Sequence, residues 1–347
     1  MWLLRWILFP ITILYSLGIW VRNKLYDLRV FSSKTFNVNT IVIGNLAIGG
    51  AGKSPITQKC VAYFNNKYKV ATLSRGYGRN TQGFKLIEKE STAEQVGDEP
   101  LQMKRNFENI TVAVDENRAH GIEILQQNHD LILLDDAFQH RKITPKCAVL
   151  LFDYNSILQP IWLLPTGNFR DSMNQTKRAD IILITKCPHT IAKIDQDKIA
   201  LKIRKHNTTA PIYYAQIQHL SPIAINQLAK DNHQAYRQAK QVFLLTGIAN
   251  PKPLVDYLQP KYERIEHLAY PDHHAFTSFD YLEIKAKIAK ATKAILFTTE
   301  KDAQRLTLDK LPDIPVYYIP ITMNITNESA FFESIEKCLL PAAKSLA

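Results

Sequence analysis

A glycine-rich turn in the first part of the chain limits its fold more than any other stretch. The β-branched run Ile41–Ile43 precedes the turn, the helix-like segment Ile56–Asn65 follows it, and the turn itself reads Gly49-Gly50-Ala51-Gly52-Lys53-Ser54. Glycines let successive backbone N–H groups point at one anion, and the start of a helix adds partial positive charge. Such a turn between a buried strand and a helix predicts a nucleotide phosphate site at residues 49–54.

Two side chains at the end of this turn have defined roles in a phosphate loop. Lys53 reaches the outer phosphates, and the Ser54 hydroxyl can ligate Mg²⁺. The usual motif also has a glycine five residues before Gly52, and this chain has Ala47 there. The loop therefore matches the motif with one departure.

An acidic pair follows a second buried-strand pattern. Four large aliphatic residues, Leu131–Leu134, precede Asp135 and Asp136. A buried parallel strand has this composition, and its C-terminal end presents carboxylates to the magnesium ion of a bound nucleotide. Strand and helix patterns alternate around it, which predicts an α/β fold. We expect a P-loop NTPase-like, mainly parallel sheet flanked by helices, followed by a second, smaller α/β domain.

Other nucleotide and metal motifs are incomplete. A guanine-binding motif needs Asp two residues after Lys186, and Pro188 stands there, which argues against a GTPase. The pair His273-His274 has no further His or Cys at ligand spacing, so a zinc site is not indicated. The four cysteines are widely separated and lack C-x-x-C spacing, which indicates neither a disulfide framework nor a zinc site.

The first thirty residues have the pattern of a membrane-associated helix. The uncharged apolar run Trp6–Val21 is shorter than the ~20 residues that span a bilayer comfortably. Interfacial tryptophans and a basic cluster after the run are typical of an anchor, namely Trp2, Trp6, Trp20, Arg22, Lys24 and Arg29. A cleaved signal peptide and a buried core helix are the alternatives. The pattern leaves open whether the segment spans the membrane or lies in it.

Length and charge set the organisation and the class of partner. A chain of 347 residues predicts two domains, and a polar, irregular stretch at Pro211–Gln241 indicates a boundary. We expect a membrane-associated helix at 1–30, a phosphate-binding domain at 31–215 and a second α/β domain at 216–347. A formal net charge of +11 suits nucleic acid, an acidic membrane surface or a phosphorylated substrate. No clustered basic and aromatic face supports nucleic acid.

A series of motifs in one order along the chain resembles the tetraacyldisaccharide 4′-kinase (lipid A 4′-kinase) family. The motifs are Gly44-Asn45 with Gly49–Pro55, Ser74–Arg79, Val96–Pro100, Asp135–His140, Leu164–Arg170, Asp272-His273 and Thr299–Asp302. The chain departs from the family pattern in three of these motifs, at Ala51, Ser54, Ala137, Thr166 and Asn168. Ser54 keeps the hydroxyl that metal ligation requires.

The resemblance implies a reaction and a set of site residues. The γ-phosphoryl group of ATP is transferred, with Mg²⁺, to the 4′-hydroxyl of an acylated disaccharide 1-phosphate lipid at the cytoplasmic face of the inner membrane. Asp98 and His273 form the base when the two domains close. Lys53, Asp135 and Asp136 are the other catalytic residues, and Glu99 is a further candidate metal ligand. Phosphates of nucleotide or substrate contact some of the following residues, which the sequence does not assign individually: Asn45, Arg75, Arg79, Arg118, His140, Arg141 and Arg170.

Two other functions use the same phosphate loop. A membrane-associated P-loop ATPase that acts as a switch or chaperone on a protein partner would hydrolyse nucleotide and need no lipid acceptor. A nucleic-acid-binding ATPase is supported only by positive charge. No protein partner is indicated by the sequence.

Overall fold

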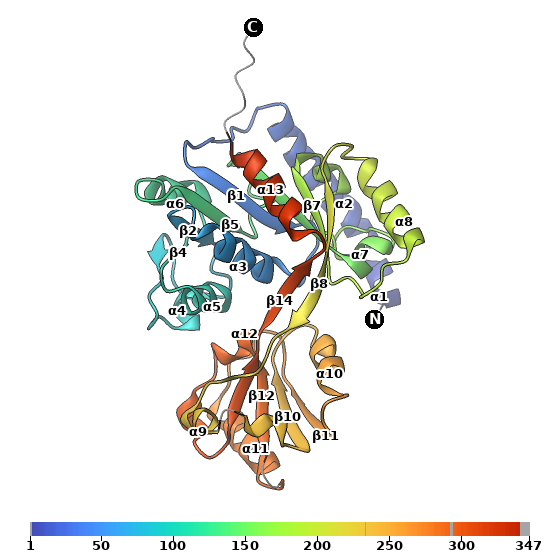
Figure 1. Cartoon of the computed structure of the whole chain (residues 1–347). Helices are drawn as coiled ribbons and strands as arrows, with labels where there is room; N and C mark the ends of the chain where they lie inside the picture. The colour runs from blue at the N-terminus through green and yellow to red at the C-terminus, as the bar shows by residue number, and fades with distance from the viewer. Residues whose placement is uncertain (1, 233, 292–293, 341–347) are drawn as a thin grey trace.

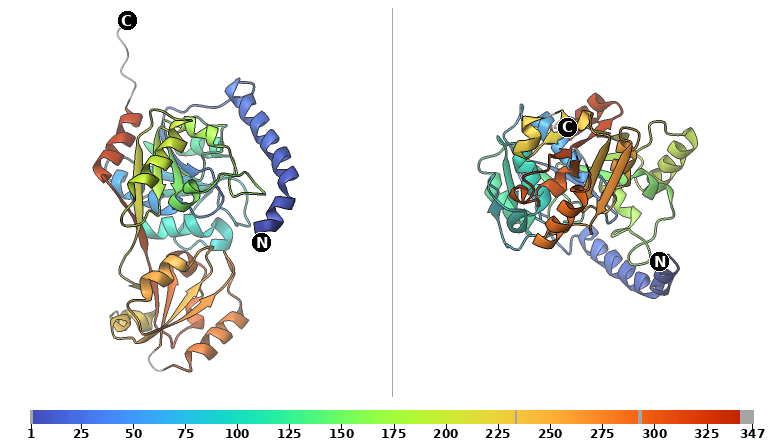
Figure 2. Two further views of the ribbon diagram at one scale, coloured as in Figure 1. Left: turned by 90° about the vertical axis from the view of Figure 1, so that its right-hand side faces the viewer. Right: turned by 90° about the horizontal axis from the view of Figure 1, so that it is seen from below.

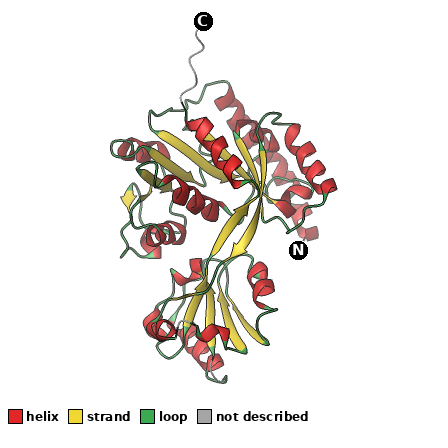
Figure 3. Ribbon diagram, viewed as in Figure 1, coloured by secondary structure: helices red, strands yellow, loops and turns green. Residues whose placement is uncertain are grey.

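The computed structural model describes residues 2–232, 234–291 and 294–340, and it contains two α/β units (Figure 1). The larger unit has a nine-stranded sheet of order β14-β8-β7-β6-β1-β5-β2-β4-β3. The smaller unit has a five-stranded sheet of order β11-β10-β12-β13-β9. The expected α/β class, with a mainly parallel sheet flanked by helices, is confirmed (Figure 3).

The strands of the larger sheet are parallel except at its two edges, where β3 and β14 run antiparallel to their neighbours. Their bounds are β1 Asn39–Asn45, β2 Val70–Ser74, β3 Lys85–Leu86, β4 Thr111–Val114, β5 Leu131–Asp135, β6 Cys147–Asp153, β7 Ile181–Thr185, β8 Ile212–His219 and β14 Ile321–Ile325. The helices of this unit are α3 Lys53–Phe64, α4 Ala93–Val96, α5 Asp98–Asn106, α6 Arg118–Leu125, α7 Tyr154–Leu158, α8 Lys193–Arg204 and α13 Glu328–Leu339, with a 3₁₀ turn at Met173–Arg178.

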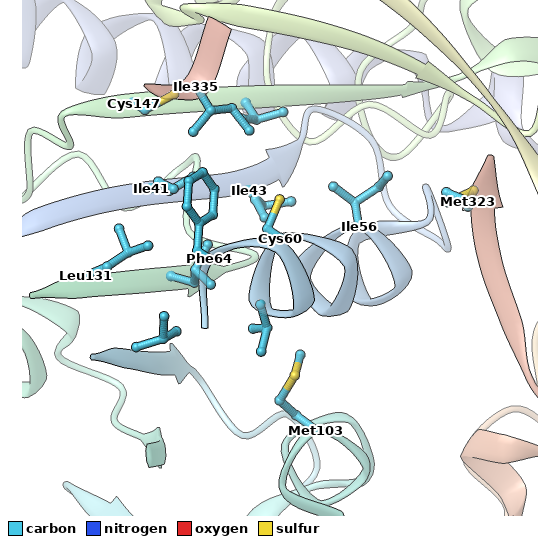
Figure 4. Close-up of a cluster of buried hydrophobic side chains, with 14 of the residues drawn as sticks. Ile41, Ile43, Ile56, Cys60, Phe64, Met103, Leu131, Cys147, Met323 and Ile335 are labelled. Carbon is cyan, nitrogen blue, oxygen red and sulfur yellow. The ribbon is translucent and has the colours of Figure 1, made fainter. Parts of the chain in front are cut away.

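The central strands are apolar because helices cover both faces of the sheet. Side chains on the two faces form two separate buried clusters. Figure 4 shows part of one cluster, in which Ile41 and Ile43 of β1 lie against Cys60 and Phe64 of α3. In-register pairing of Ile43 with Asp135 brings the C-terminal ends of β1 and β5 to one edge of the sheet. That edge carries the phosphate loop.

The smaller unit is built around its own apolar core. Its strands are β9 Ile223–Ala224, β10 Gln241–Thr246, β11 Arg264–Ala269, β12 Ile295–Thr299 and β13 Val316–Ile319. Its helices are α9 Gln227–Asp231, α10 Lys252–Leu258, α11 Ser278–Ile288 and α12 Glu300–Ala303, with 3₁₀ turns at Ala235–Arg237 and Leu308–Lys310. Phe243 and Phe297 of the central strands are fully buried, each on a different face of the sheet.

The chain returns to the larger unit after β13, which corrects the expected second domain of residues 216–347. Strand β14 pairs with β8, where Ile325 lies opposite Ala215. Helix α13 then packs on the larger unit, and its Phe332 ring stacks on Tyr63 of α3 with 3.8 Å between ring centroids. The return was missed because β14 is short and of mixed polarity. Strands β8 and β14 lie side by side where the two units meet (Figure 1).

The N-terminal segment forms two helices, α1 Trp2–Ile7 and α2 Phe9–Asp27. Helix α2 lies along the outside of the larger unit (Figure 2). Among the helices of the described residues, none has both the length and the apolar character needed to cross a bilayer. The membrane association of this segment stays a prediction.

Phe332→Ala tests whether α13 belongs to the core of the larger unit. Phe332 is 2% exposed, and truncating a buried phenylalanine costs about 3 kcal/mol of unfolding free energy. Urea unfolding followed by circular dichroism measures this loss. The control is Phe279→Ala, a residue 73% exposed on α11, for which we expect a change below about 0.5 kcal/mol. Equal effects of the two substitutions would contradict the assignment of α13.

Candidate active site

The phosphate loop joins the end of β1 to the start of α3. Gly49 and Gly52 have positive φ angles of 95° and 75°, which favour glycine. A Cβ added to Gly52 would also meet the terminal methyl of Met323 of β14, which is the movable end of a flexible side chain, so the positive φ is the stronger restriction at this position. A Cβ added to Gly49 would meet nothing within 4 Å. The structure thus forms the turn that the sequence predicts, with open space beside its first glycine.

Lys53 and the acidic pair lie together at this edge of the sheet. Lys53 Nζ is 3.4 Å from Asn45 Oδ1 and 3.8 Å from Asp136 Oδ2. Thr57, one turn further along α3, donates a hydrogen bond of 3.2 Å to Asp135 Oδ1. Ser54 directly follows Lys53 at the helix start. Two strands and one helix therefore converge on a single group of oxygen atoms and one ammonium.

The two neighbouring carboxylates have opposite pKa shifts. Burial and the nearby Glu99 charge raise the pKa of Asp135 above its usual value, although Lys53 acts in the other direction. Burial also disfavours ionisation of Asp136, but the Lys53 charge and a hydrogen bond from Arg170 outweigh it and hold the pKa below the usual value. Asp136 therefore has two cationic neighbours, Lys53 and Arg170, whereas the Lys53 charge does not offset the burial of Asp135. Carboxylate and hydroxyl oxygens are the ligands that Mg²⁺ prefers, and a cation beside Asp135 would also offset the burial of its carboxylate.

Arg170 reaches the phosphate loop from the loop 163–171. Its guanidinium pairs with Asp136 and donates a 2.9 Å hydrogen bond to Asn45 Oδ1. The backbone of the same loop is bonded to the phosphate loop, through Arg170 N to Leu46 O at 2.8 Å and Ile48 N to Asn168 O at 2.8 Å. An antiparallel bridge between Ala47 and Phe169 lies between these bonds. Ala47, which replaces the usual glycine, thus belongs to a strand-like contact.

The Asp98–His273 pair connects the two units. Asp98 starts α5 in the larger unit, and its Oδ2 lies 3.0 Å from His273 Nδ1 in the smaller unit. Lys301 Nζ lies 3.3 Å from His273 Nε2 and 3.1 Å from Glu99 Oε1. Because an ammonium can only donate, Nε2 is the acceptor and Nδ1 carries the hydrogen that is donated to Asp98. The structure therefore brings together the pair that the family resemblance implied, and places Lys301 beside it.

Arg305 and Asp302 hold the His273 loop in place. Arg305 donates to the carbonyl oxygens of His274 and Gly247 at 3.0 and 3.1 Å, pairs with Asp302, and has its Nε 3.4 Å from Asp98 Oδ2. Asp302 also accepts from Gly247 N at 3.0 Å. Sequence reasoning missed Arg305 and gave Lys301 no role. The motif Thr299–Asp302, which caps α12 through a Thr299–Asp302 hydrogen bond, was the available signal.

Four other candidates, Arg118, His140, Arg75 and Arg79, have different surroundings. Arg118 is 5% exposed, and burial lowers its pKa to about 10 despite the Asp136 charge. Burial and the Arg118 charge lower the pKa of His140 to about 4, so this imidazole is neutral near pH 7. Arg79 pairs with Glu116. These two residues and the exposed Arg75 line a cavity of about 600 Å³. Glu116 links two of the four candidates, because Arg118 also donates to its carbonyl oxygen at 3.2 Å.

Arg141 is placed elsewhere. Its guanidinium donates to Asn23 O at 2.9 Å and to Asp27 Oδ1 at 2.7 Å, both on α2, and lies over the Tyr26 ring. These bonds occupy Arg141 at the α2 contact. The expected phosphate contact of Arg141 is therefore corrected to a structural one.

Distant cysteines also meet in the fold. Ligand atoms of Cys147, Asp180 and Cys338 lie within 4.8 Å of one another, the only such group among residues 2–232, 234–291 and 294–340. Sequence spacing gave no sign of this group, because its members come from β6, the residue before β7 and α13. Cys147 begins β6, whereas the phosphate loop lies beyond the other end of the parallel strands.

Comparisons with known proteins agree with the site. The family model for tetraacyldisaccharide-1-P 4′-kinase (LpxK) matches residues 4–340. The tetraacyldisaccharide 4′-kinase of Flavobacterium johnsoniae is 41% identical over 334 residues, covering 95% of this chain and 96% of the relative. That of Phocaeicola vulgatus is 36% identical, with 91% and 89% covered.

A solved structure shares the fold. The crystal structure of LpxK from Aquifex aeolicus in complex with ATP has a TM-score of 0.74 and 23% identity, and covers 97% of this chain and 100% of that one. The two curated relatives are identical at more than a third of aligned positions over almost their whole length. On the strength of these matches and the family model, the chain belongs to the tetraacyldisaccharide 4′-kinase family.

Proposed function

We propose that this protein transfers the γ-phosphoryl group of ATP to the 4′-hydroxyl of a tetraacyldisaccharide 1-phosphate. The Asp98–His273 contact across the two units carries this proposal, because it joins Asp98 of α5 and His273 of the smaller unit in one hydrogen-bonded acid–base pair. The Glu99 charge, one residue further along α5, is close enough to raise the pKa of Asp135. The tetraacyldisaccharide 4′-kinase activity for which the relatives are named supports the acceptor, and ATP in the Aquifex aeolicus structure supports the donor.

The donor half of the site neutralises phosphate charge. Phosphoryl transfer needs mainly positioning and electrostatic stabilisation, because charge spreads over the oxygens of the transferred group. Lys53 and the backbone amides of the loop would bind the β- and γ-phosphates. Arg170 already lies between Asn45 and Asp136, where it can contact the transferred group. Arg118 adds a second buried positive charge close to Asp136.

A divalent ion fits the oxygen atoms at this edge. Ser54, Asp135 and Asp136 would hold Mg²⁺, and Glu99 is a further candidate that Lys301 binds in this structure. When bound, the ion supplies positive charge between the phosphates. A bound cation would offset the burial that, with the Glu99 charge, raises the pKa of Asp135.

The acceptor half removes a proton. The 4′-hydroxyl must lose its proton as its oxygen attacks phosphorus and the bond to the ADP oxygen breaks, and the Asp98–His273 pair would take that proton. The Nδ1–H of His273 bonds to Asp98 and orients the carboxylate, while Arg305 adds positive charge on the same oxygen. Lys301 contributes positive charge at the other His273 nitrogen. Each unit thus supplies one half of the pair.

Lys53→Ala tests the donor assignment in a transfer assay with radiolabelled ATP and an acylated disaccharide 1-phosphate acceptor. Loss of the ammonium should lower kcat/KM at least about 100-fold. The control is Lys59→Ala on the same helix, where the lysine pairs with Glu328 instead and transfer should stay within about twofold. Wild-type protein that hydrolyses ATP at a rate unaffected by acceptor, with no label in the lipid, would favour an ATPase acting on a protein partner.

We also propose that α2 docks the enzyme on the cytoplasmic face of the inner membrane, where both ATP and an acylated acceptor are available. The outer face of α2 exposes Leu14 by 69% and Leu17 by 55%, with Trp20 one turn further. The basic residues Arg22 and Lys24 follow, which suits anionic lipid headgroups. Apolar side chains beside cations are the pattern of a helix that binds an acidic bilayer surface.

Leu14→Glu/Leu17→Glu tests the docking face by sedimentation with vesicles that contain anionic lipid. Two carboxylates replace apolar area and repel the surface, so we expect binding to fall at least about tenfold. The matched control is Ile194→Glu/Leu201→Glu on α8, whose side chains are 62% and 63% exposed. Vesicle binding lost equally in both double variants, or in neither, would contradict docking through α2.

A further inference from the structure

The fully buried side chains of α2 are polar. The two buried residues of this helix are Thr12 and Asn23, whereas Leu14 and Leu17 are exposed. Most amphipathic helices bury their apolar side against the protein, so the polarity of α2 is reversed. Hydrogen bonds therefore help to position α2, beside apolar contacts such as that of Phe9 with Trp162, and they are directional in a way that apolar packing is not.

Four of these hydrogen bonds end on the loop 163–171. Thr12 Oγ1 lies 2.7 Å from Thr166 Oγ1 and accepts from Thr166 N at 3.1 Å. Tyr15 donates its hydroxyl to Arg170 O at 2.8 Å, and Asn23 donates to Asp171 Oδ1 at 2.9 Å. Helix α2 thus binds the backbone of Arg170 itself, Thr166 before it in the sequence and Asp171 after it.

A second route runs from α2 to the phosphate loop through Gln139. Arg22 donates to the Gln139 carbonyl oxygen at 2.8 Å, and the Gln139 amide donates to Asn45 O at 2.6 Å. Asn45 ends β1 and accepts from Arg170 and Lys53 through its side chain. Both routes therefore meet at Asn45 and Arg170, next to the acidic pair.

We infer that α2 positions the phosphate-binding centre, so that docking on the membrane and the geometry of Arg170 are coupled. This inference rests on the proposed kinase function. In water, the exposed apolar face gives α2 no preference for its docked position. On a bilayer, that face is buried and the polar face is held toward the loop 163–171, which fixes the backbone that carries Arg170. Thr12 and Tyr15 are positioning residues in this account.

The alternative is that α2 is only an anchor. The loop 163–171 has its own backbone bonds to the phosphate loop, such as Arg170 N to Leu46 O, and these could hold Arg170 without help from α2. Under that alternative, removing the α2 hydroxyls would leave transfer unchanged. A destabilised fold would instead lower activity to the same extent whether or not Arg170 is present.

Thr12→Val/Tyr15→Phe separates these possibilities, because it removes two hydroxyls while keeping side-chain shape. We measure kcat with saturating radiolabelled ATP and acceptor in detergent micelles, first in wild-type protein and then in an Arg170→Ala background. The coupling predicts a fall in kcat of about tenfold in the first background and of less than about twofold in the second, because the variant acts through Arg170. Binding to anionic vesicles should not change.

Ser16→Ala is the matched control. Its hydroxyl donates to Thr12 O within α2 rather than to the loop, so kcat should stay at the wild-type value. Unchanged kcat in Thr12→Val/Tyr15→Phe, or an equal fall with and without Arg170, would overturn the coupling. Wild-type protein that transfers no label at all would refute the proposed kinase function instead, and this is measured first.

Discussion

Parallel pairing of β1 with β5 is the constraint on which the rest of the site depends. It sets Ile43 opposite Asp135 and brings the phosphate loop and the acidic pair to one sheet edge. The pairing requires close approach at Gly44, where an added Cβ would lie 2.6 Å from Phe138 Cβ. A side chain there would separate the segment after β5 from the end of β1. The glycine at this position therefore serves the contact between two strand ends rather than a turn.

The donor half of the site could be predicted from the sequence because its residues are contiguous or end a recognisable strand. Lys53 and Ser54 follow a glycine-rich turn, and Asp135 follows four aliphatic residues. Local physical chemistry is enough to predict such motifs. The acceptor half is different, since Asp98 and His273 lie 175 positions apart and each resembles an ordinary turn residue. Their pairing was implied by family resemblance and depends on how two units meet.

Other features were beyond sequence reasoning for physical reasons. Strand β14 is five residues of mixed polarity at a sheet edge, so its pattern carries little information. Arg141 lies in a motif near the acidic pair, yet α2 offers it a carbonyl oxygen and a carboxylate, and the guanidinium is bound there. Arg305 acts through backbone carbonyl oxygens that no side-chain pattern reports. In each case the partner is distant in sequence and the contact depends on tertiary placement.

The central claim is that Asp98 and His273 act as one unit on the acceptor hydroxyl, and a double-mutant cycle on transfer kinetics tests it most directly. Asp98→Asn, His273→Gln and the double variant are compared with wild-type protein at saturating ATP. If the pair acts as a unit, each single substitution lowers kcat by a large factor, the double variant is about as slow as the slower single one, and the KM for ATP changes little. Multiplicative losses in kcat, or a defect confined to the KM for ATP, would contradict the account.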